Sequence, residues 1–169
     1  MAILEIKKYP EKILKQKAAY VENIDSDIQL LIDNMLETMY ASKGVGLAAN
    51  QVGVLKRVCT IDTSTKEEKR PPIVLINPAI VEIEGNQESE EGCLSIPGHI
   101  LTIKRAMKVS AKGLSREGKT VEIEATGLLA RALQHEIDHL DGLLIIDRIS
   151  PIKRTFLKKR IKKSLQEKK

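Results

Sequence analysis

The chain has 169 residues and carries 28 Lys and Arg against 23 Asp and Glu, a formal net charge of +5 at pH 7. This length suits one domain with a single core, which must be mostly Ile, Leu and Val because the chain has one Phe and three Tyr. No apolar stretch approaches the ~18 residues of a membrane helix, and two cysteines in unlike contexts make no disulfide framework, which favours a reducing cytoplasm.

The first helix is predicted to run from about residue 26 to about residue 43. Asp25, Ser26 and Asp27 offer side chains that can cap its N-terminus. Apolar residues recur at the spacing of a helix with one buried face: Ile28, Leu31, Ile32, Met35 and Met39.

Residues 44–53, Gly-Val-Gly-Leu-Ala-Ala-Asn-Gln-Val-Gly, are too apolar and too rich in small side chains for an ordinary surface loop. One interpretation is a helix end followed by a tight crossing of two backbone segments. Small residues also let the backbone approach a ligand closely. In that case Gln51 would be a polar group in a packed location, suited to donating a hydrogen bond to a developing oxyanion.

Period-two patterns and turn residues predict several short strands. The candidates are residues 57–62, 73–76, 79–84, 100–103, and a hairpin of 107–113 with 119–125 around a turn at 115–118. Residues 65–72 are charged and end in two prolines, which indicates a surface loop. A further short strand is predicted at residues 143–146.

A helix over residues 127–141 carries the most informative motif, His135-Glu136-Ile137-Asp138-His139. Positions i and i+4 share one helix face, so both imidazoles can converge on a metal ion while Glu136 takes a proton from water bound to that ion. Thr126 can cap this helix and Gly142 can end it. On a helical wheel both histidines and Glu136 share an arc with apolar side chains, and the opposite edge carries Arg131, Gln134, Asp138 and Asp141.

A catalytic zinc-like site needs three protein ligands and one open position. Cys59 lies in a β-branched strand and is interpreted as a small core residue. Cys93, in Glu-Glu-Gly-Cys-Leu-Ser (90–95), could also be a buried free thiol, but beside the histidine motif it is the better candidate for the third ligand. His99 is near Cys93 in sequence and is expected to lie in an exposed loop.

Residues 153–169 contain nine Lys or Arg and one Glu, a charge of +8, while the rest of the chain carries −3. Ser150 can cap a helix here, and Pro151 fits its first turn. Five apolar residues could form its docking stripe: Ile152, Phe156, Leu157, Ile161 and Leu165. A solvated charged face is one interpretation of the lysines, and contact with a polyanion such as RNA is the other.

Strands grouped between helices favour an α+β fold. We expect antiparallel β-sheets packed around a central metal-binding helix, with a C-terminal helix. Residues 1–169 are predicted to form a single catalytic domain, and the basic C-terminal helix at 150–169 is part of it.

Three segments together resemble the signature motifs of the peptide deformylases, in the order and spacing of that family: residues 44–51, 91–95 and 134–140. The resemblance extends over essentially the whole chain and is to bacterial members with a helical C-terminus. Asn50 falls at a position that varies among relatives. Ile100 lies where some bacterial members carry a basic residue that helps to hold the substrate.

The resemblance implies metal-dependent hydrolysis of the N-terminal formyl group from formyl-methionine of new polypeptides, with release of formate. Metal ligation falls to Cys93, His135 and His139, and general base catalysis to Glu136. The Gln51 amide and the backbone N–H of Leu94 would meet the charge on the formyl oxygen. Five residues are expected to bind the substrate: Val45, Gly46, Gly92, Leu128 and Ala132.

One thiolate and two imidazoles suit several divalent ions. By resemblance Fe²⁺ is expected in the cell, and Zn²⁺, Ni²⁺ or Co²⁺ in preparations. The expected partners are nascent formyl-methionyl polypeptides and, through the basic helix, the ribosome. We expect a monomer without a membrane partner. The N-terminus lacks a secretory pattern, so the bacterial cytoplasm is the expected location.

Two other functions stay open on the residues alone. A zinc endopeptidase shares the His-Glu-x-x-His chemistry but usually takes a carboxylate or a third histidine as its remaining ligand. A metal-stabilised RNA-binding module would use the basic tail, although structural zinc sites normally have four ligands and the sequence offers no convincing fourth.

Overall fold

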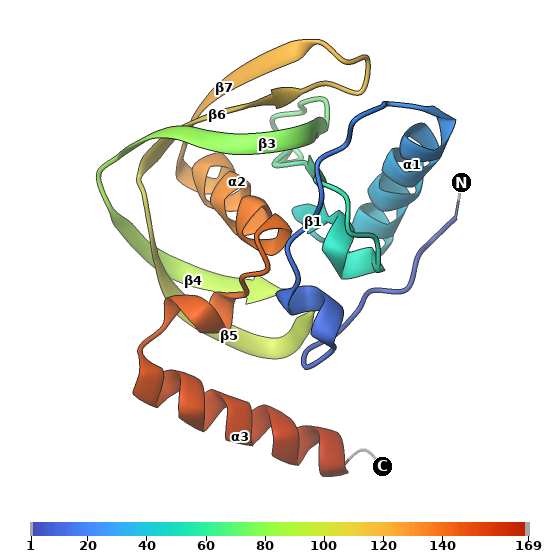
Figure 1. Cartoon of the computed structure of the whole chain (residues 1–169). Helices are drawn as coiled ribbons and strands as arrows, with labels where there is room; N and C mark the ends of the chain where they lie inside the picture. The colour runs from blue at the N-terminus through green and yellow to red at the C-terminus, as the bar shows by residue number, and fades with distance from the viewer. Residues whose placement is uncertain (1, 168–169) are drawn as a thin grey trace.

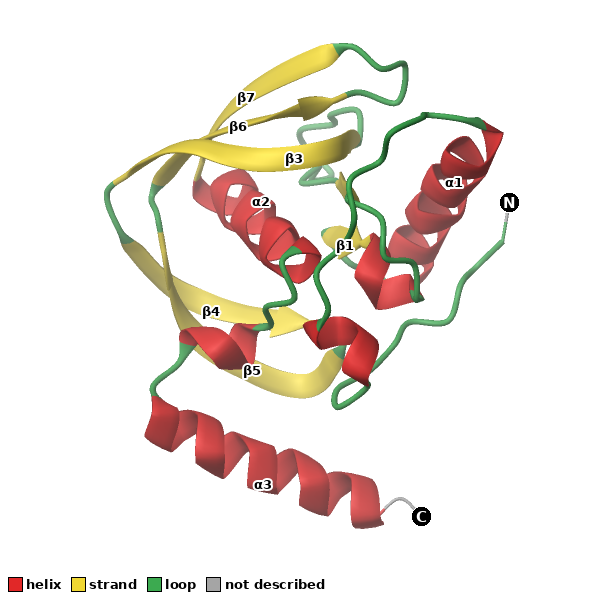
Figure 2. Ribbon diagram, in the orientation of Figure 1, coloured by secondary structure: helices red, strands yellow, loops and turns green. Residues whose placement is uncertain are grey.

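Helix α2 (Gly127–Leu140) lies between two antiparallel β-sheets in the computed structural model, which describes residues 2–167 (Figure 1). The larger sheet has the strand order β1-β2-β3-β6-β7, and the smaller one pairs β4 with β5. Helix α1 (Ser26–Ala41) packs at one side, and α3 (Pro151–Glu167) lies below the smaller sheet (Figure 2). The predicted α+β fold with a C-terminal helix is confirmed.

The five-stranded sheet consists of β1 (Gly46–Ala48), β2 (Val58–Ile61), β3 (Ile73–Glu84), β6 (Lys108–Leu114) and β7 (Thr120–Thr126). The hairpin of β6 and β7 around the turn at 115–118 is confirmed. The two strands predicted at 73–76 and 79–84 are one strand with a register shift between Ile76 and Ala79. Asn77 at this shift has φ 53° and bonds to both backbone polar groups of Val21.

The smaller sheet consists of β4 (Gln87–Cys93) and β5 (Ile96–Arg105). The sequence did not predict β4, because its run of glutamates has no apolar alternation and the strand exists through its pairing with β5. The strand predicted at 100–103 is the middle of β5. The hairpin between these strands carries Cys93 on its β4 side.

The prediction of a strand at residues 143–146 is wrong. These residues lead into a 3-10 helix, η3 (Ile145–Arg148), whose first turn is closed by the Asp147 carboxylate accepting from the Leu144 N–H at 2.8 Å. The apolar run is nevertheless buried, since Leu144, Ile145 and Ile146 pack against the smaller sheet. Burial without alternation does not distinguish a short strand from a helical turn.

The core is aliphatic, as the composition predicted, but it is divided into three clusters rather than forming the single core expected. One lies between α2 and the larger sheet, a second beneath α1, and a third joins the smaller sheet to η3 and α3. The predicted N-cap of α1 is confirmed, because the Asp25 carboxylate accepts from the Ile28 N–H at 3.0 Å. Of the helices in residues 2–167, none has the length and apolar composition needed to cross a bilayer.

The docking stripe predicted on α3 is only partly correct. Leu157 and Ile161 are buried, each 6% exposed, and pack on the third cluster. Ile152 and Phe156 are 71% and 66% exposed, because the helix touches the body along a narrower line than the sequence pattern suggests. Lys168 and Lys169 of the basic tail lie outside the described residues.

Candidate active site

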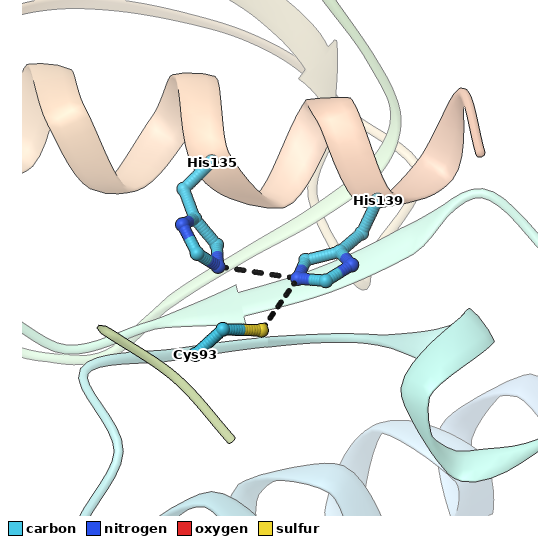
Figure 3. A group of neighbouring side chains, drawn as sticks. All are labelled: Cys93, His135 and His139. Atoms are coloured by element: carbon cyan, nitrogen blue, oxygen red, sulfur yellow. Dashed lines mark hydrogen bonds between the residues drawn. The ribbon is translucent and has the colours of Figure 1, made fainter. Parts of the chain in front are cut away.

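Cys93, His135 and His139 converge on one point between α2 and the β4–β5 hairpin (Figure 3). Their ligand atoms all lie within 4.8 Å of one another. The Nε2 atoms of the two histidines are 3.1 Å apart, and His139 Nε2 lies 3.4 Å from Cys93 Sγ. The structure therefore brings together the three residues that the sequence proposed as metal ligands.

Local structure explains how each ligand arrives. His135 and His139 are one turn apart on α2, so their rings project from the same face. Gly142 ends this helix region with φ 79°, and a β-carbon there would meet the Lys15 carbonyl at 2.6 Å. Cys93 is the last residue of β4, where the tight turn to Ile96 points its sulfur toward the helix.

A carboxylate fixes the ring of His135. Its Nδ1 lies 3.1 Å from Glu91 Oε1, and an ionised carboxylate only accepts hydrogen bonds. The proton of the neutral ring is therefore on Nδ1, which leaves a lone pair on Nε2 facing His139 and Cys93. Metal-bound histidines commonly have such a carboxylate behind them.

The donor set suits a divalent metal ion. Ligand atoms about 2.0 to 2.3 Å from a tetrahedral ion lie about 3.3 to 3.6 Å apart, close to the 3.1 Å between the two Nε2 atoms and the 3.4 Å between His139 Nε2 and Cys93 Sγ. The Nδ1 of His139 and the Oε2 of Glu136 are buried polar atoms without a partner among the described residues. Soft sulfur and borderline nitrogen donors favour zinc or a first-row transition metal over calcium or magnesium.

The two imidazoles differ in their proton affinity. Burial lowers the pKa of His135, but hydrogen bonds with Cys93 and Glu91 outweigh it and raise that pKa to about 10. Burial and the neighbouring charge of His135 lower the pKa of His139 well below its usual value. A metal ligand must be a neutral imidazole, so a bound cation would displace the proton that His135 holds.

Glu136 lies beside this cluster in a nearly dry environment, 3% exposed. Burial raises the pKa of its carboxyl to about 7. A general base works best when its pKa lies near the operating pH. The packing against Gly46 is tight, since a β-carbon at residue 46 would come 2.6 Å from Glu136 Oε1.

Gln51 is buried with its amide held in one orientation. Its Oε1 accepts from the Ala48 N–H at 3.0 Å, while its Nε2 donates to Ser95 Oγ at 3.1 Å and lies 3.8 Å from Cys93 Sγ. The sequence placed Gln51 at the site, and the structure puts its N–H group beside the thiol. Ser95, its partner, was not singled out by the sequence.

A cavity of about 550 Å³ opens onto the cluster. All five residues proposed for substrate binding line it, together with Leu94, and they come from three separate segments: Val45, Gly46, Gly92, Leu128 and Ala132. The apolar residues Val45 and Leu128 are 39% and 45% exposed. Apolar side chains left open beside titratable groups are typical of a ligand site.

The sequence missed several residues around this cavity. His99 belongs to β5, is half-buried and lines the cavity, so the predicted exposed loop is wrong. Lys43 and Arg131 bring two cations to its rim. Glu91 and Arg105 form a buried ion pair behind His135, with Arg105 Nη2 at 2.9 Å from Glu91 Oε1. No sequence pattern pairs residues from two neighbouring strands in this way.

Asp138 was assigned to the polar edge of α2, yet it is only 8% exposed. It accepts hydrogen bonds from two arginines, Arg105 and Arg148, which satisfy its buried charge. A helical wheel does not reveal such burial, because it depends on basic residues supplied by other elements.

Comparison with known proteins agrees with this geometry. A family model described as polypeptide deformylase matches residues 3–155. The peptide deformylase of Thermodesulfovibrio yellowstonii is 62% identical over 96% of this chain and 98% of its own length, and that of Syntrophobacter fumaroxidans is 53% identical over 99% and 98%.

Solved structures give the same result. The crystal structure of peptide deformylase from Ehrlichia chaffeensis covers 98% of both chains with a TM-score of 0.92 and 38% identity. The complex of peptide deformylase from Ehrlichia chaffeensis with actinonin covers 97% of this chain and 98% of that one, with a TM-score of 0.91 and 40% identity. With the family model and these relatives spanning nearly the whole molecule, the chain belongs to the polypeptide deformylase family.

Proposed function

We propose that this chain, as a member of its family, hydrolyses the formyl group from the N-terminal formyl-methionine of new polypeptides. Water breaks the C–N bond of the formamide, and the products are formate and a polypeptide with a free amino terminus. One observation carries the proposal: the thiol of Cys93 and the two imidazoles meet at a cavity wall beside the buried carboxylate of Glu136.

Cys93, His135 and His139 would hold one divalent metal ion. When bound, the ion supplies Lewis-acid activation of water and of the formyl carbonyl. We propose Fe²⁺ as the ion in the cell, with Zn²⁺, Ni²⁺ or Co²⁺ taken up in preparations, because one thiolate and two imidazoles accept all four. Metal analysis after anaerobic purification tests this, and stoichiometric zinc with full activity would exclude iron as a requirement.

Glu136 would act as the general base. Its carboxylate takes a proton from water as that water attacks the formyl carbon, and it then delivers the proton to the leaving amine. A burial-raised pKa near 7 suits both transfers. The close packing of the Glu136 carboxylate on Gly46 supports this role, because it restricts the movement of the carboxylate beside the cavity.

Charge that develops on the formyl oxygen would be stabilised by the Gln51 amide and by the backbone N–H of Leu94. The fixed orientation of the amide, held by Ala48 and Ser95, supports Gln51, because a donor that is already oriented needs no reorganisation during the reaction. Val45, Leu128 and Ala132 would contact the methionine side chain, while Gly46 and Gly92 let the peptide backbone approach.

Incubation with formyl-Met-Ala-Ser tests the proposal. Release of formate together with intact Met-Ala-Ser is the expected result. Cleavage of an internal peptide bond would instead support the endopeptidase. If the metal-loaded protein gave no reaction, the RNA-binding module would be the remaining alternative. Either result would overturn the proposed activity.

We further propose that α3 brings the enzyme to the ribosome. Six of its basic side chains are exposed in the described part of the helix: Lys153, Lys158, Lys159, Arg160, Lys162 and Lys163. Cosedimentation with ribosomes should fall when Lys159 and Lys163 are both changed to Glu, and it should weaken steeply with salt. Lys66→Glu with Lys69→Glu, in the loop at 65–72, is the matched charge control. Equal loss in both double variants would contradict a specific role of α3.

We propose that residues 1–169 act as one monomeric catalytic domain in the bacterial cytoplasm, where formylated chains are made. The packing of Leu157 and Ile161 on the third core cluster supports α3 as part of that domain. Sedimentation of the metal-loaded protein at working concentration tests the monomer, which a stable dimer would contradict.

A further inference from the structure

Four charged side chains form a continuous chain of hydrogen bonds behind His135. Glu91 accepts from both Nε and Nη2 of Arg105 at 2.9 Å, and Arg105 Nη1 donates to Asp138 Oδ2 at 2.6 Å. Arg148 completes the chain, with Nε at 3.0 Å from Asp138 Oδ2 and Nη2 at 2.6 Å from Oδ1. The chain thus runs from a ring of the metal cluster to η3, the short helix between α2 and α3 (Figure 1).

The two middle members are deeply buried: the side chains of Arg105 and Asp138 are 3% and 12% exposed. Glu91 is buried as well, with 9% of its side chain exposed. Arg148, at 44%, is the member that reaches solvent. Two carboxylates are therefore buried around one buried guanidinium, and within these four side chains Arg148 supplies the second positive charge.

We propose that Arg148 is a positioning residue for the metal cluster. By neutralising Asp138, it leaves Arg105 free to hold Glu91 with two parallel hydrogen bonds. Glu91 in turn fixes the ring and the tautomer of His135. The inference rests on the proposed metal-binding role of His135, and it assigns a function to a residue of η3 that touches neither metal ligand nor cavity.

Loss of Arg148 has a definite consequence. Asp138 Oδ1 accepts from Arg148 Nη2 and would lose that bond, and Arg105 would be the remaining cation for both carboxylates. Arg105 donates to both carboxylates, with Nε and Nη2 to Glu91 and Nη1 to Asp138, so the uncompensated charge of Asp138 would draw its guanidinium away from Glu91. The support behind His135 would loosen, and metal would leave more easily.

The test uses the full chain loaded with Co²⁺. In Arg148→Met, we expect release of Co²⁺ to a chelator to accelerate about 10-fold, within the range seen when supporting groups of metal ligands are removed. The visible absorption bands of the bound cobalt should shift, since the ligand geometry changes. With formyl-Met-Ala-Ser, kcat should fall while KM stays near that of the wild type. Arg148→Lys should recover part of the slow release, because it restores the charge without the paired hydrogen bonds.

Two further variants separate positioning from general stability. Lys15→Met removes the ion pair between Lys15 and Asp147, which holds the same short helix without touching Asp138. It should leave Co²⁺ release unchanged. In Asp138→Asn the buried charge is gone, so adding Arg148→Met should accelerate release much less than it does in the wild type.

Release by Arg148→Met within twofold of the wild type would overturn the inference. Equal acceleration in Lys15→Met would also overturn it, because the effect would then come from η3 as a whole. The release rate needs no catalysis, so failure of the proposed deformylation would appear separately, as cobalt-loaded wild type that yields no formate.

Discussion

Gly46 and Glu136 are packed so closely that a β-carbon on residue 46 would come 2.6 Å from Glu136 Oε1 and 2.9 Å from its Cδ. Gly46 is the first residue of β1, at the cavity wall, and Glu136 is on the helix that carries both histidines. Gly46 does not have a positive φ, so its backbone conformation does not require a glycine. The glycine is required because the Glu136 carboxylate occupies the space that a side chain would need.

Gly46→Ala should displace Glu136 from its position. We expect kcat for formyl-Met-Ala-Ser to fall at least about 10-fold, because a shift of the order of 1 Å in a catalytic group can cost about 100-fold. Metal content should be unchanged, since the ligands are not touched. A variant with wild-type kcat would show that the carboxylate can act from a second position.

Glu136→Ala should separate catalysis from metal binding. Removal of a general base is expected to lower kcat by about 100-fold to 10,000-fold. The three ligand atoms do not include this residue, so the protein should still bind one metal ion per chain. Glu136→Gln, which keeps the shape without the base, should be equally inactive. Turnover close to the wild type in either variant would remove Glu136 from the mechanism.

Cys93→Ser should weaken metal binding, because a serine hydroxyl is a far poorer ligand than a thiolate for zinc or iron. Cys59→Ser is the matched control, since Cys59 is fully buried in the first core cluster. It should lower the unfolding temperature but keep one metal ion per folded chain. Equal metal loss in the two variants, or none in Cys93→Ser, would contradict the ligand assignment.

Tyr40 provides a test in alkaline solution. Tyr40 is 50% exposed, and the partial burial of its hydroxyl together with its hydrogen bond to Asp62, 2.6 Å long, raises its pKa from 10.0 to about 12. The folded state thus holds this proton more tightly, so the stabilisation is complete below pH about 10 and is lost as the pH rises through about 12. The wild type should therefore have a higher free energy of unfolding than Tyr40→Phe at pH 8, and this difference should be smaller at pH 11.

The control is a double-mutant cycle with Asp62→Asn. The coupling energy between Tyr40→Phe and Asp62→Asn should be present at pH 8 and should shrink toward pH 11, as measured by denaturant unfolding. A coupling energy that is constant over this range would show that the hydrogen bond does not titrate with Tyr40.

Local periodicity and spacing in the sequence determined the metal helix, the capped α1 helix, the β6–β7 hairpin and the aliphatic core. In the helices and the hairpin, neighbours within a few residues set the structure: one helical turn brings His135 and His139 to the same face, and the Asp25 side chain reaches the backbone three residues later. The resemblance of residues 44–51 and 91–95 to the motifs of the family also indicated Gln51 and Cys93, which lie far from the histidines in sequence.

Only the tertiary structure decided which charged groups became buried and what satisfied them. Glu91, Arg105, Asp138 and Arg148 come from β4, β5, α2 and η3, and none of them has an apolar pattern that marks it as interior. The tertiary structure also decided the strand conformation of β4, the 3-10 turn at η3 and the exposure of Phe156 on α3. Their conformation and burial depend on partners brought close by folding, and the energy of a buried charge is decided by those partners rather than by its neighbours in sequence.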